Sequence, residues 1–256
     1  MAGVRAEIAR RFMYTIIRMN TDDLRHKAVS QGSEKLATGN TGRLGWLWDI
    51  GYVLFTALFF YEIPFKGFVF ITRDLLQYFY PLGVSLREAW RGSGSFLWDS
   101  GIDHGIPMLA RYSPTVFYPS TLLYAAFPAD QAMSLAILLH FPIAASSTFR
   151  IAQRFTGNVP AAWAGGLAYA FSGYMITMIG GGFYCFGAAL LPLGVLALIR
   201  LAEGPGIWRA MQLAAVFSLQ IFNADPQTLY YEVLVLLPVL LVAHASLRVA
   251  LFRGCH

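Results

Sequence analysis

The sequence predicts an all-α fold, a polytopic bundle of about six transmembrane helices with a long outer loop between the first span and the second. Three observations support this. Hydrophobic residues make up 57% of the chain, charged residues 13%, and the mean hydropathy is +0.53, which is too apolar for an ordinary soluble domain. Apolar runs long enough to cross the hydrocarbon core recur along the chain. One polar, Pro- and Gly-rich stretch, residues 65–130, separates the first run from the others.

The chain begins with a basic arm and linker, residues 1–45, which hold eight of the 19 Lys and Arg residues. Basic residues near a span favour the cytoplasmic side, so we expect this arm there. Its apolar residues recur at helical spacing, which fits an amphipathic helix on an anionic membrane surface; a frayed, solvated tail is the alternative. The arm lacks the apolar core of a cleavable signal, so the first span is expected to act as an uncleaved anchor.

Six apolar segments are the expected spans, with the stretch 118–127 too short to cross and expected to re-enter or lie at the surface. The third is rich in small residues that permit close helix contact. Of the two cysteines, neither a disulfide nor a zinc site is expected. The expected spans are residues 46–64, 131–149, 161–179, 183–201, 210–222 and 228–247.

Basic residues also fix the expected orientation. With the N-terminus inside, the inner segments carry 14 Lys and Arg residues and the outer segments five, all in the long loop. This distribution follows the positive-inside rule. It leaves residues 248–256 as a short cytoplasmic tail, and it favours a membrane protein over one that binds nucleic acid.

The outer loop predicts an interfacial helix from Asp74 to Trp90, because apolar residues there share one face while charged ones lie elsewhere. Pro81 is expected to kink or restart this helix. Turn-forming residues dominate residues 92–119, which we expect to be irregular but packed.

Asp74 is the candidate catalytic residue. A carboxylate at an apolar boundary has a raised pKa and can serve as a general base. Arg73, its neighbour, would oppose that shift or hold an anionic phosphate. The alternative is structural, since aspartate at the first turn of a helix is favourable without catalysis.

Asp99, Asp103 and His104 form a second candidate group. Two carboxylates and an imidazole could bind a divalent metal. Local Asx-turn chemistry in a glycine-rich loop is the commoner outcome, so no cofactor or metal site is assigned.

Further candidates lie in the later spans. Asp225 and Gln227 flank Pro226, and they could offer hydrogen bonds to a sugar or diphosphate, or simply cap a turn. His140 lies in the middle of a span, where it could relay protons, although a buried, hydrogen-bonded histidine is the simpler expectation. Glu232 is expected near the outer interface or in the site itself.

The order of several short motifs resembles the N-terminal portion of YfhO-like bacterial membrane proteins, which belong to the GT-C class of polytopic glycosyltransferases. The resemblance covers residues 46–247. The expected Asn-Pro after the tryptophan of the outer loop is replaced here by Asp99-Ser100. Because such proteins continue through more spans, the chain is expected to be a fragment or a reduced relative. The motifs are Arg73-Asp74-Leu75, Tyr80-Pro81, Trp90-Arg91-Gly92, Trp98-Asp99, Gly105-Ile106-Pro107, Phe117-Tyr118-Pro119, Ala170-Phe171-Ser172-Gly173 and Asp225-Pro226-Gln227.

The resemblance implies transfer of a sugar from a polyprenyl-phosphate donor on the outer face of the membrane, with Asp74 as the base. It implies membrane lipids and the lipid-linked donor as partners. The rival hypothesis is a non-catalytic membrane subunit, a scaffold with a protein partner in a larger complex. A transporter is less favoured because the spans carry few polar groups and no obvious internal repeat. The sequence has no nucleotide-binding glycine loop, nucleophile elbow or HExxH motif.

Overall fold

Helices make up most of the part of the chain that the computed structural model describes, residues 45–101, 104–110, 115–223 and 225–238, and the all-α fold class is confirmed. The described residues from Trp48 onward form a single compact unit. The elements are a helix Gly45–Phe59, α2 Glu62–Lys66, the π-helix η1 Leu75–Phe79, α3 Tyr80–Arg91, β1 Trp98–Asp99, β2 Ile106–Pro107, η2 Pro119–Leu122, α4 Leu123–Ala126, α5 Ala129–Thr156, α6 Val159–Ala170, α7 Gly173–Met178, η3 Ile179–Gly181, α8 Phe183–Glu203, α9 Ile207–Phe222 and a helix over residues 226–238.

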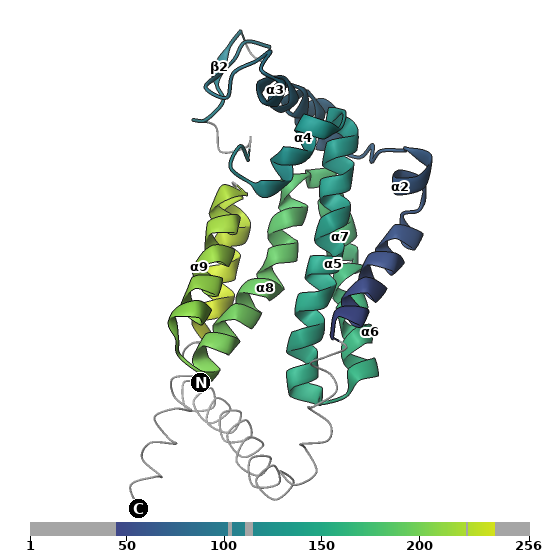
Figure 1. Ribbon diagram of the computed structural model, residues 1–256, viewed down its shortest axis with the longest axis vertical. Helices are drawn as coiled ribbons and strands as arrows, with labels where there is room; N and C mark the ends of the chain where they lie inside the picture. The colour runs from purple at the N-terminus through teal and green to yellow at the C-terminus, as the bar shows by residue number, and fades with distance from the viewer. Residues whose placement is uncertain (1–44, 102–103, 111–114, 224, 239–256) are drawn as a thin grey trace, which may run out of the picture. The chain divides into compact units, whose positions relative to one another are not determined.

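The bundle is organised around α5, which at 28 residues is about 42 Å long. This helix packs against α6 on one side and α8 on the other, and α9 packs against α8 (Figure 1). Within the described residues, α5 and α8 are the two helices long and apolar enough to cross a membrane. Helix Gly45–Phe59 and α9 are apolar but shorter, so the count of six spans stays a prediction.

The small residues of α6 bring it close to α5, as the sequence predicts. A Cβ atom at Gly166 would lie 2.4 Å from the Tyr52 hydroxyl and 2.6 Å from the carbonyl oxygen of Ala145 on α5. The neighbouring Gly165 has more room, with Ala152 Cβ at 3.8 Å. Of the two adjacent glycines, Gly166 is therefore the one at which a side chain would collide with α5.

Two predicted spans differ in detail from the helices. The third, expected to be continuous, breaks between α6 and α7, where the Ser172 hydroxyl accepts a hydrogen bond from Met175 N at 3.3 Å and caps a new helix. The first ends earlier than expected, at Phe59, and the short helix α2 follows it. At Ser172 the local cap outweighs the continuous apolar run, whereas α2 begins at Glu62 without a side-chain cap.

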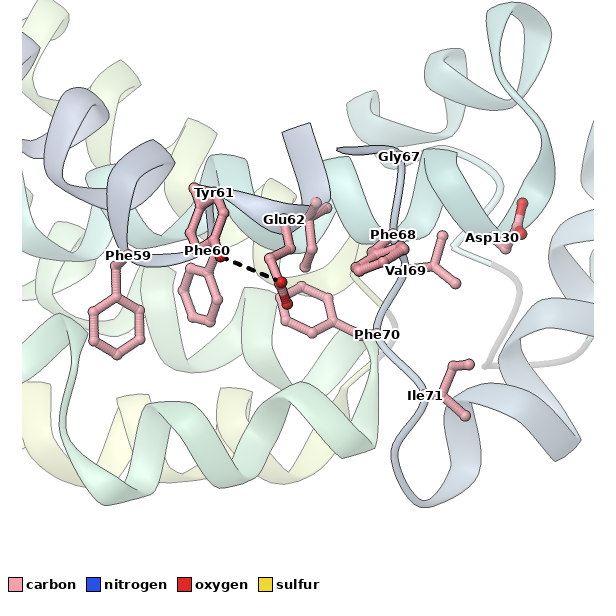
Figure 2. Close-up of a pocket in the computed structure, with 11 residues that line it drawn as sticks. Phe59, Phe60, Tyr61, Glu62, Gly67, Phe68, Val69, Phe70, Ile71 and Asp130 are labelled. Atoms are coloured by element: carbon pink, nitrogen blue, oxygen red, sulfur yellow. Dashed lines mark hydrogen bonds between the residues drawn. The ribbon is translucent and has the colours of Figure 1, made fainter. Parts of the chain in front are cut away.

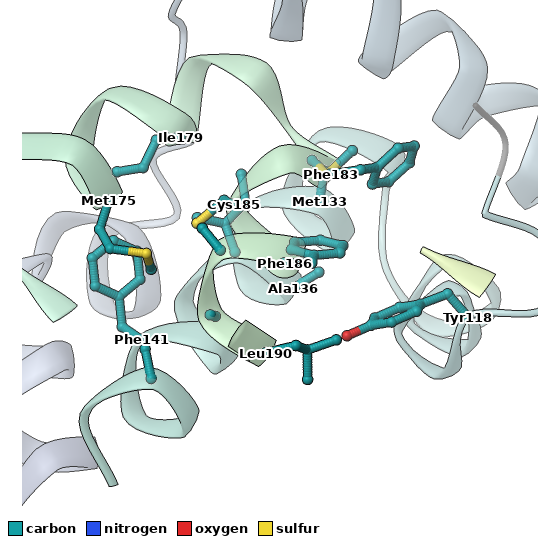
Figure 3. Close-up of a cluster of buried hydrophobic side chains, with 14 of the residues drawn as sticks. Tyr118, Met133, Ala136, Phe141, Met175, Ile179, Phe183, Cys185, Phe186 and Leu190 are labelled. Atoms are coloured by element: carbon teal, nitrogen blue, oxygen red, sulfur yellow. The ribbon is translucent and has the colours of Figure 1, made fainter. Parts of the chain in front are cut away.

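Buried aromatic and sulfur-containing side chains fill the centre of the bundle (Figure 3). His140 of α5 lies among them, stacked on Phe186 with ring centroids 4.0 Å apart. Its Nδ1 lies 2.7 Å from the Ala136 carbonyl oxygen and its Nε2 lies 2.6 Å from the Tyr118 hydroxyl. Because a carbonyl oxygen only accepts, Nδ1 carries the hydrogen and Tyr118 donates to Nε2. His140 is thus the buried, hydrogen-bonded histidine that the sequence suggested.

Arginines gather at the end of the bundle where α5 and α8 finish. Arg150 forms an ion pair with Asp49 at 2.6 Å, and Arg154 pairs with Glu203. Arg200 interacts electrostatically with both of these arginines. All of these arginines were assigned to the inner side from the sequence.

At the start of the outer loop, η1 continues directly into α3. Pro81 stands in the first turn of α3, where its missing N–H costs nothing. The Tyr80 N–H donates to the Leu75 carbonyl oxygen, the wider turn of a π-helix. Pro81 thus restarts the helix, as expected. The apolar face of the segment is buried, with Phe79 and Leu86 among its members.

Candidate functional site

Arg73 and Asp74 lie at the start of η1. Arg73 adopts a left-handed backbone with φ of 45°, which costs a non-glycine residue about 1–3 kcal/mol. Its aliphatic stem packs against Gly180, where an added Cβ would lie 2.8 Å from Arg73 Cδ. Asp74 is exposed and occupies the N-cap position, but its side chain makes no capping hydrogen bond. Asp74 thus stands at the helix start that the structural alternative requires, without the side-chain capping bond, and both of its candidate roles stay predictions.

The glycine turn, Gly180 to Gly182, packs against Arg73 and the π-helix that follows it. Gly182 has φ of 57°, and a Cβ there would lie 2.8 Å from the Phe79 ring. Residues 73–79 are therefore in close contact with the turn between α7 and α8. The structure brings together two features that the sequence assigned separately to the outer face, the Arg73-Asp74 pair and the glycine turn.

The second candidate group is only partly described. Asp99 is buried, and its Oδ1 accepts a hydrogen bond from Gly101 N at 2.9 Å, which is an Asx turn. His104 is exposed with φ of 64°, while Asp103 lies outside the described residues. No group of three or more His, Cys, Asp or Glu side chains that could hold a metal occurs in the described part of the chain. A pocket of about 540 Å³ adjoins Asp99 and includes Glu88 of α3.

Asp225 and Gln227 have different surroundings. Asp225 is buried and caps the helix over residues 226–238, because its Oδ1 accepts from Thr228 N at 3.1 Å and its Oδ2 accepts from the Thr228 hydroxyl. Pro226 takes the first helical position, where proline is favoured. Gln227 is exposed and donates to the Tyr231 hydroxyl at 3.1 Å. Asp225 therefore serves as a cap, one of the two roles the sequence allowed.

An aromatic pocket of about 600 Å³ lies between the end of the first helix and the start of α5 (Figure 2). Phe59, Phe68 and Phe70 are among its walls, with Ile71 leading directly into the Arg73-Asp74 segment. The wall carboxylate of Glu62 accepts a hydrogen bond from Lys66 at 3.1 Å and raises the pKa of that lysine. The pocket is thus mainly apolar, and Lys66 balances one acidic wall residue.

Three tyrosines, which we call the loop tyrosines, anchor the outer loop to the bundle: Tyr80, Tyr118 and Tyr124. Burial raises the pKa of each above the ordinary tyrosine value, because the charged phenolate is disfavoured away from water. Tyr80 donates to the Phe70 carbonyl oxygen and Tyr118 donates to His140. The Tyr124 hydroxyl has no hydrogen-bond partner among the described residues.

Sequence reasoning missed one polar cluster, on α9 and the helix that follows. Gln220 and Asn223 are fully buried on α9, and Glu232 is fully buried on the helix that follows. The sequence places Glu232 either at the interface or in the site. A signal was present in the sequence, because Gly187 and Gly194 on α8 have the same seven-residue spacing as Asp225 and Glu232.

Comparison with protein-family models, curated proteins and solved structures yields no match for this chain.

Proposed function

We propose that this chain is a membrane glycosyltransferase, or the N-terminal part of one, that transfers a sugar from a polyprenyl-phosphate donor on the outer face of the membrane. Asp74 is its general base. The observation that carries the proposal is the strained Arg73 packed on Gly180, next to the exposed Asp74, which follows the pocket residue Ile71 by three positions. Strained backbone of this kind concentrates at functional sites.

Membrane insertion is the first part of the proposal. Leu139, near the middle of α5, is 57% exposed, and Leu54 and Leu58 on the first helix are 63% and 73% exposed. Lipid is a better environment than water for such outward-facing leucines on apolar helices. We propose about six spans, two of which meet the length of a full crossing within the described residues.

Orientation is the second part. The arginines at the far ends of α5 and α8, with their partners Asp49 and Glu203, are proposed to lie on the cytoplasmic side. The opposite end, with Asp74 and the glycine turn, then faces outward. This arrangement suits a substrate carried by a lipid in the outer leaflet.

The chemistry follows from the two side chains at the start of η1. Asp74 takes the proton of an acceptor hydroxyl as that oxygen attacks the anomeric carbon of the donor sugar. The bond between the anomeric carbon and the phosphate oxygen breaks, and the polyprenyl phosphate leaves with the electron pair. The guanidinium of Arg73 stabilises the developing phosphate charge. A single displacement inverts the configuration at the anomeric carbon.

The aromatic pocket is proposed to take the first prenyl units of the donor. Its walls are mainly apolar, with Glu62 and Asp130 as the two acidic members, and the last wall residue of this segment, Ile71, lies two positions before Arg73. A lipid tail lying there would place its phosphate near the arginine. Gln227 is exposed and is available for contact with substrate, whereas Asp225 is occupied as a helix cap.

Transfer in membranes from a radiolabelled polyprenyl-phosphate sugar tests the proposal. Asp74→Asn should reduce kcat/KM by about 100-fold or more, because the base is lost while the shape is kept. Glu203→Gln, the same chemical change at an exposed acid on the far end of α8, is the control and should keep full activity. Unchanged transfer by Asp74→Asn would remove Asp74 from the reaction. No transfer by the unaltered chain, together with stable co-purification of a membrane protein, would favour the scaffold subunit instead.

A further inference from the structure

Arginines from three helices meet at the end of the bundle where α5 and α8 finish, and we call them the arginine cluster: Arg150, Arg154, Arg200 and Arg209. Arg150 and Arg154 lie one turn apart on α5, so they share a face of that helix. Arg154 forms an ion pair with Glu203 of α8, and Arg200 lies one turn before Glu203. The charged side chains of α5 and α8 therefore meet beside Arg200.

Arg209 joins the cluster from the start of α9. Its Nη1 donates hydrogen bonds to the carbonyl oxygens of Arg200 and Gly204, each at 2.8 Å. Both bonds use only one of the three guanidinium nitrogens. The carbonyl oxygens carry no formal charge, and the dipole of α8 supplies only about half a negative charge at this end. The contacts orient Arg209 but leave much of its positive charge unbalanced.

The acids that pair with the cluster are already used. Both carboxylate oxygens of Asp49 accept hydrogen bonds at 2.6 Å, one from Arg150 and the other from a serine hydroxyl of α5. Glu203 is paired with Arg154. Arg200, by contrast, forms no ion pair among the described residues. The cluster therefore carries an excess of positive charge, which lies at the ends of α8 and α9.

Exposed apolar side chains flank the arginine cluster. Phe155 follows Arg154 on α5 and is 76% exposed. Ile207 and Trp208, which precede Arg209 on α9, are 71% and 74% exposed. Tryptophan beside basic residues is typical of the headgroup level of a membrane. A phospholipid can cover these surfaces with its acyl chains, which free phosphate cannot do, so the apolar flank favours a lipid.

The charge of the cluster determines the kind of headgroup that fits. A phosphate offers a guanidinium two oxygens at once, and such charge-assisted pairs are stronger than neutral hydrogen bonds. A zwitterionic headgroup also brings an ammonium group, which the arginines repel. A headgroup with a net negative charge has no such repulsion and balances the excess positive charge.

We propose that Arg200 and Arg209 form a binding site for the phosphate of an anionic phospholipid. The phosphate lies at the ends of α8 and α9, and the ion pair of Arg154 with Glu203 already joins α8 to α5 there. One lipid molecule thus holds three helices together. The inference rests on the membrane insertion proposed above and not on the transfer reaction of Asp74.

The test uses the purified full chain in lipid nanodiscs of phosphatidylcholine with an increasing share of phosphatidylglycerol. Tm should rise with the share of phosphatidylglycerol and then saturate, and native mass spectrometry should find phosphatidylglycerol still bound after transfer to detergent. Arg200→Gln should weaken this binding by about fivefold, as expected for the loss of one arginine near a headgroup. Arg209→Gln should weaken it to a similar extent, and it carries the test if Arg200→Gln does not fold.

Arg91→Gln is the matched control, because it removes an exposed arginine at the end of α3 and should leave phosphatidylglycerol binding unchanged. Equal Tm in both lipids, with no retained phosphatidylglycerol, would overturn the inference. An equal rise in Tm with inorganic phosphate, added at constant ionic strength, would overturn the assignment to a lipid. A chain that does not insert into nanodiscs would refute the membrane proposal and this inference with it. An inserted chain that binds phosphatidylglycerol but transfers no sugar would support this inference and contradict only the transferase.

Discussion

Replacing Tyr118 by phenylalanine removes the hydroxyl that fastens the returning end of the outer loop to α5. The hydroxyl lies 2.6 Å from His140 Nε2 and is the only hydrogen-bond donor to that nitrogen among the described residues. Because Nδ1 is committed to the Ala136 carbonyl oxygen, the ring cannot turn its hydrogen to compensate. The variant leaves a buried acceptor unsatisfied, so we expect a loss of about 1–3 kcal/mol in the free energy of unfolding.

Tyr124→Phe makes the same change at a second buried tyrosine of the loop. The Tyr124 hydroxyl is buried but has no hydrogen-bond partner among the described residues. Removing it relieves an unsatisfied group, so the free energy of unfolding should stay unchanged or rise by about 1 kcal/mol. Both variants therefore remove the hydroxyl of a buried tyrosine. They differ in whether that hydroxyl forms a hydrogen bond.

Thermal unfolding of both variants in one detergent, followed by intrinsic fluorescence, measures the difference. For a chain of this size each kcal/mol corresponds to about 2–4 °C in Tm. Tyr118→Phe should melt below the unaltered chain and Tyr124→Phe at or above it. Equal destabilisation by the two changes would show that the hydrogen-bond argument is wrong and that packing alone decides.

Three further predictions follow from contacts described above. Gly166→Ala should destabilise the chain by about 1–3 kcal/mol, because its methyl group would collide with the Tyr52 hydroxyl, whereas Gly165→Ala should unfold at nearly the unaltered Tm. Gly180→Ala should lower kcat/KM for transfer by displacing the left-handed arginine, while Gly173→Ala, with nothing within 4 Å, should not; equal activity would contradict this. Burial raises the pKa of the loop tyrosines, so their stabilising contribution is complete below pH about 10 and is lost as pH rises toward the folded-state value. Tyrosinate absorbance and helical circular dichroism, followed together in an alkaline titration, should therefore change in the same pH range, and ionisation without loss of helix would contradict this.

Sequence periodicity predicted the long helices well because their burial is continuous. The expected segments 131–149 and 183–201 lie inside α5 and α8. The break at Ser172 does not follow from periodicity, because the apolar run is continuous there and the new helix is capped by a single hydrogen bond from Met175 N to the Ser172 hydroxyl. A side-chain cap such as that of Ser172 can therefore start a new helix inside an apolar run.

The candidate site was harder to predict than the fold. Arg73 and Asp74 could be selected by their place after the first span, but the contact with Gly180 joins residues more than a hundred positions apart. The contact between Glu232 and Gly194 also joins two different helices. A glycine in a predicted span can allow close helix packing, form a turn or leave space for a side chain of another helix. Only the tertiary structure shows which of these roles it has.

The central claim is that position 74 faces the non-cytoplasmic side of the membrane, where a lipid-borne sugar can reach it. Asp74→Cys in a chain whose two native cysteines are replaced by serine tests this directly, with a membrane-impermeant maleimide added to intact cells. The account predicts labelling from outside without permeabilisation. Labelling only after the membrane is opened would place Asp74 in the cytoplasm and contradict the proposed transfer.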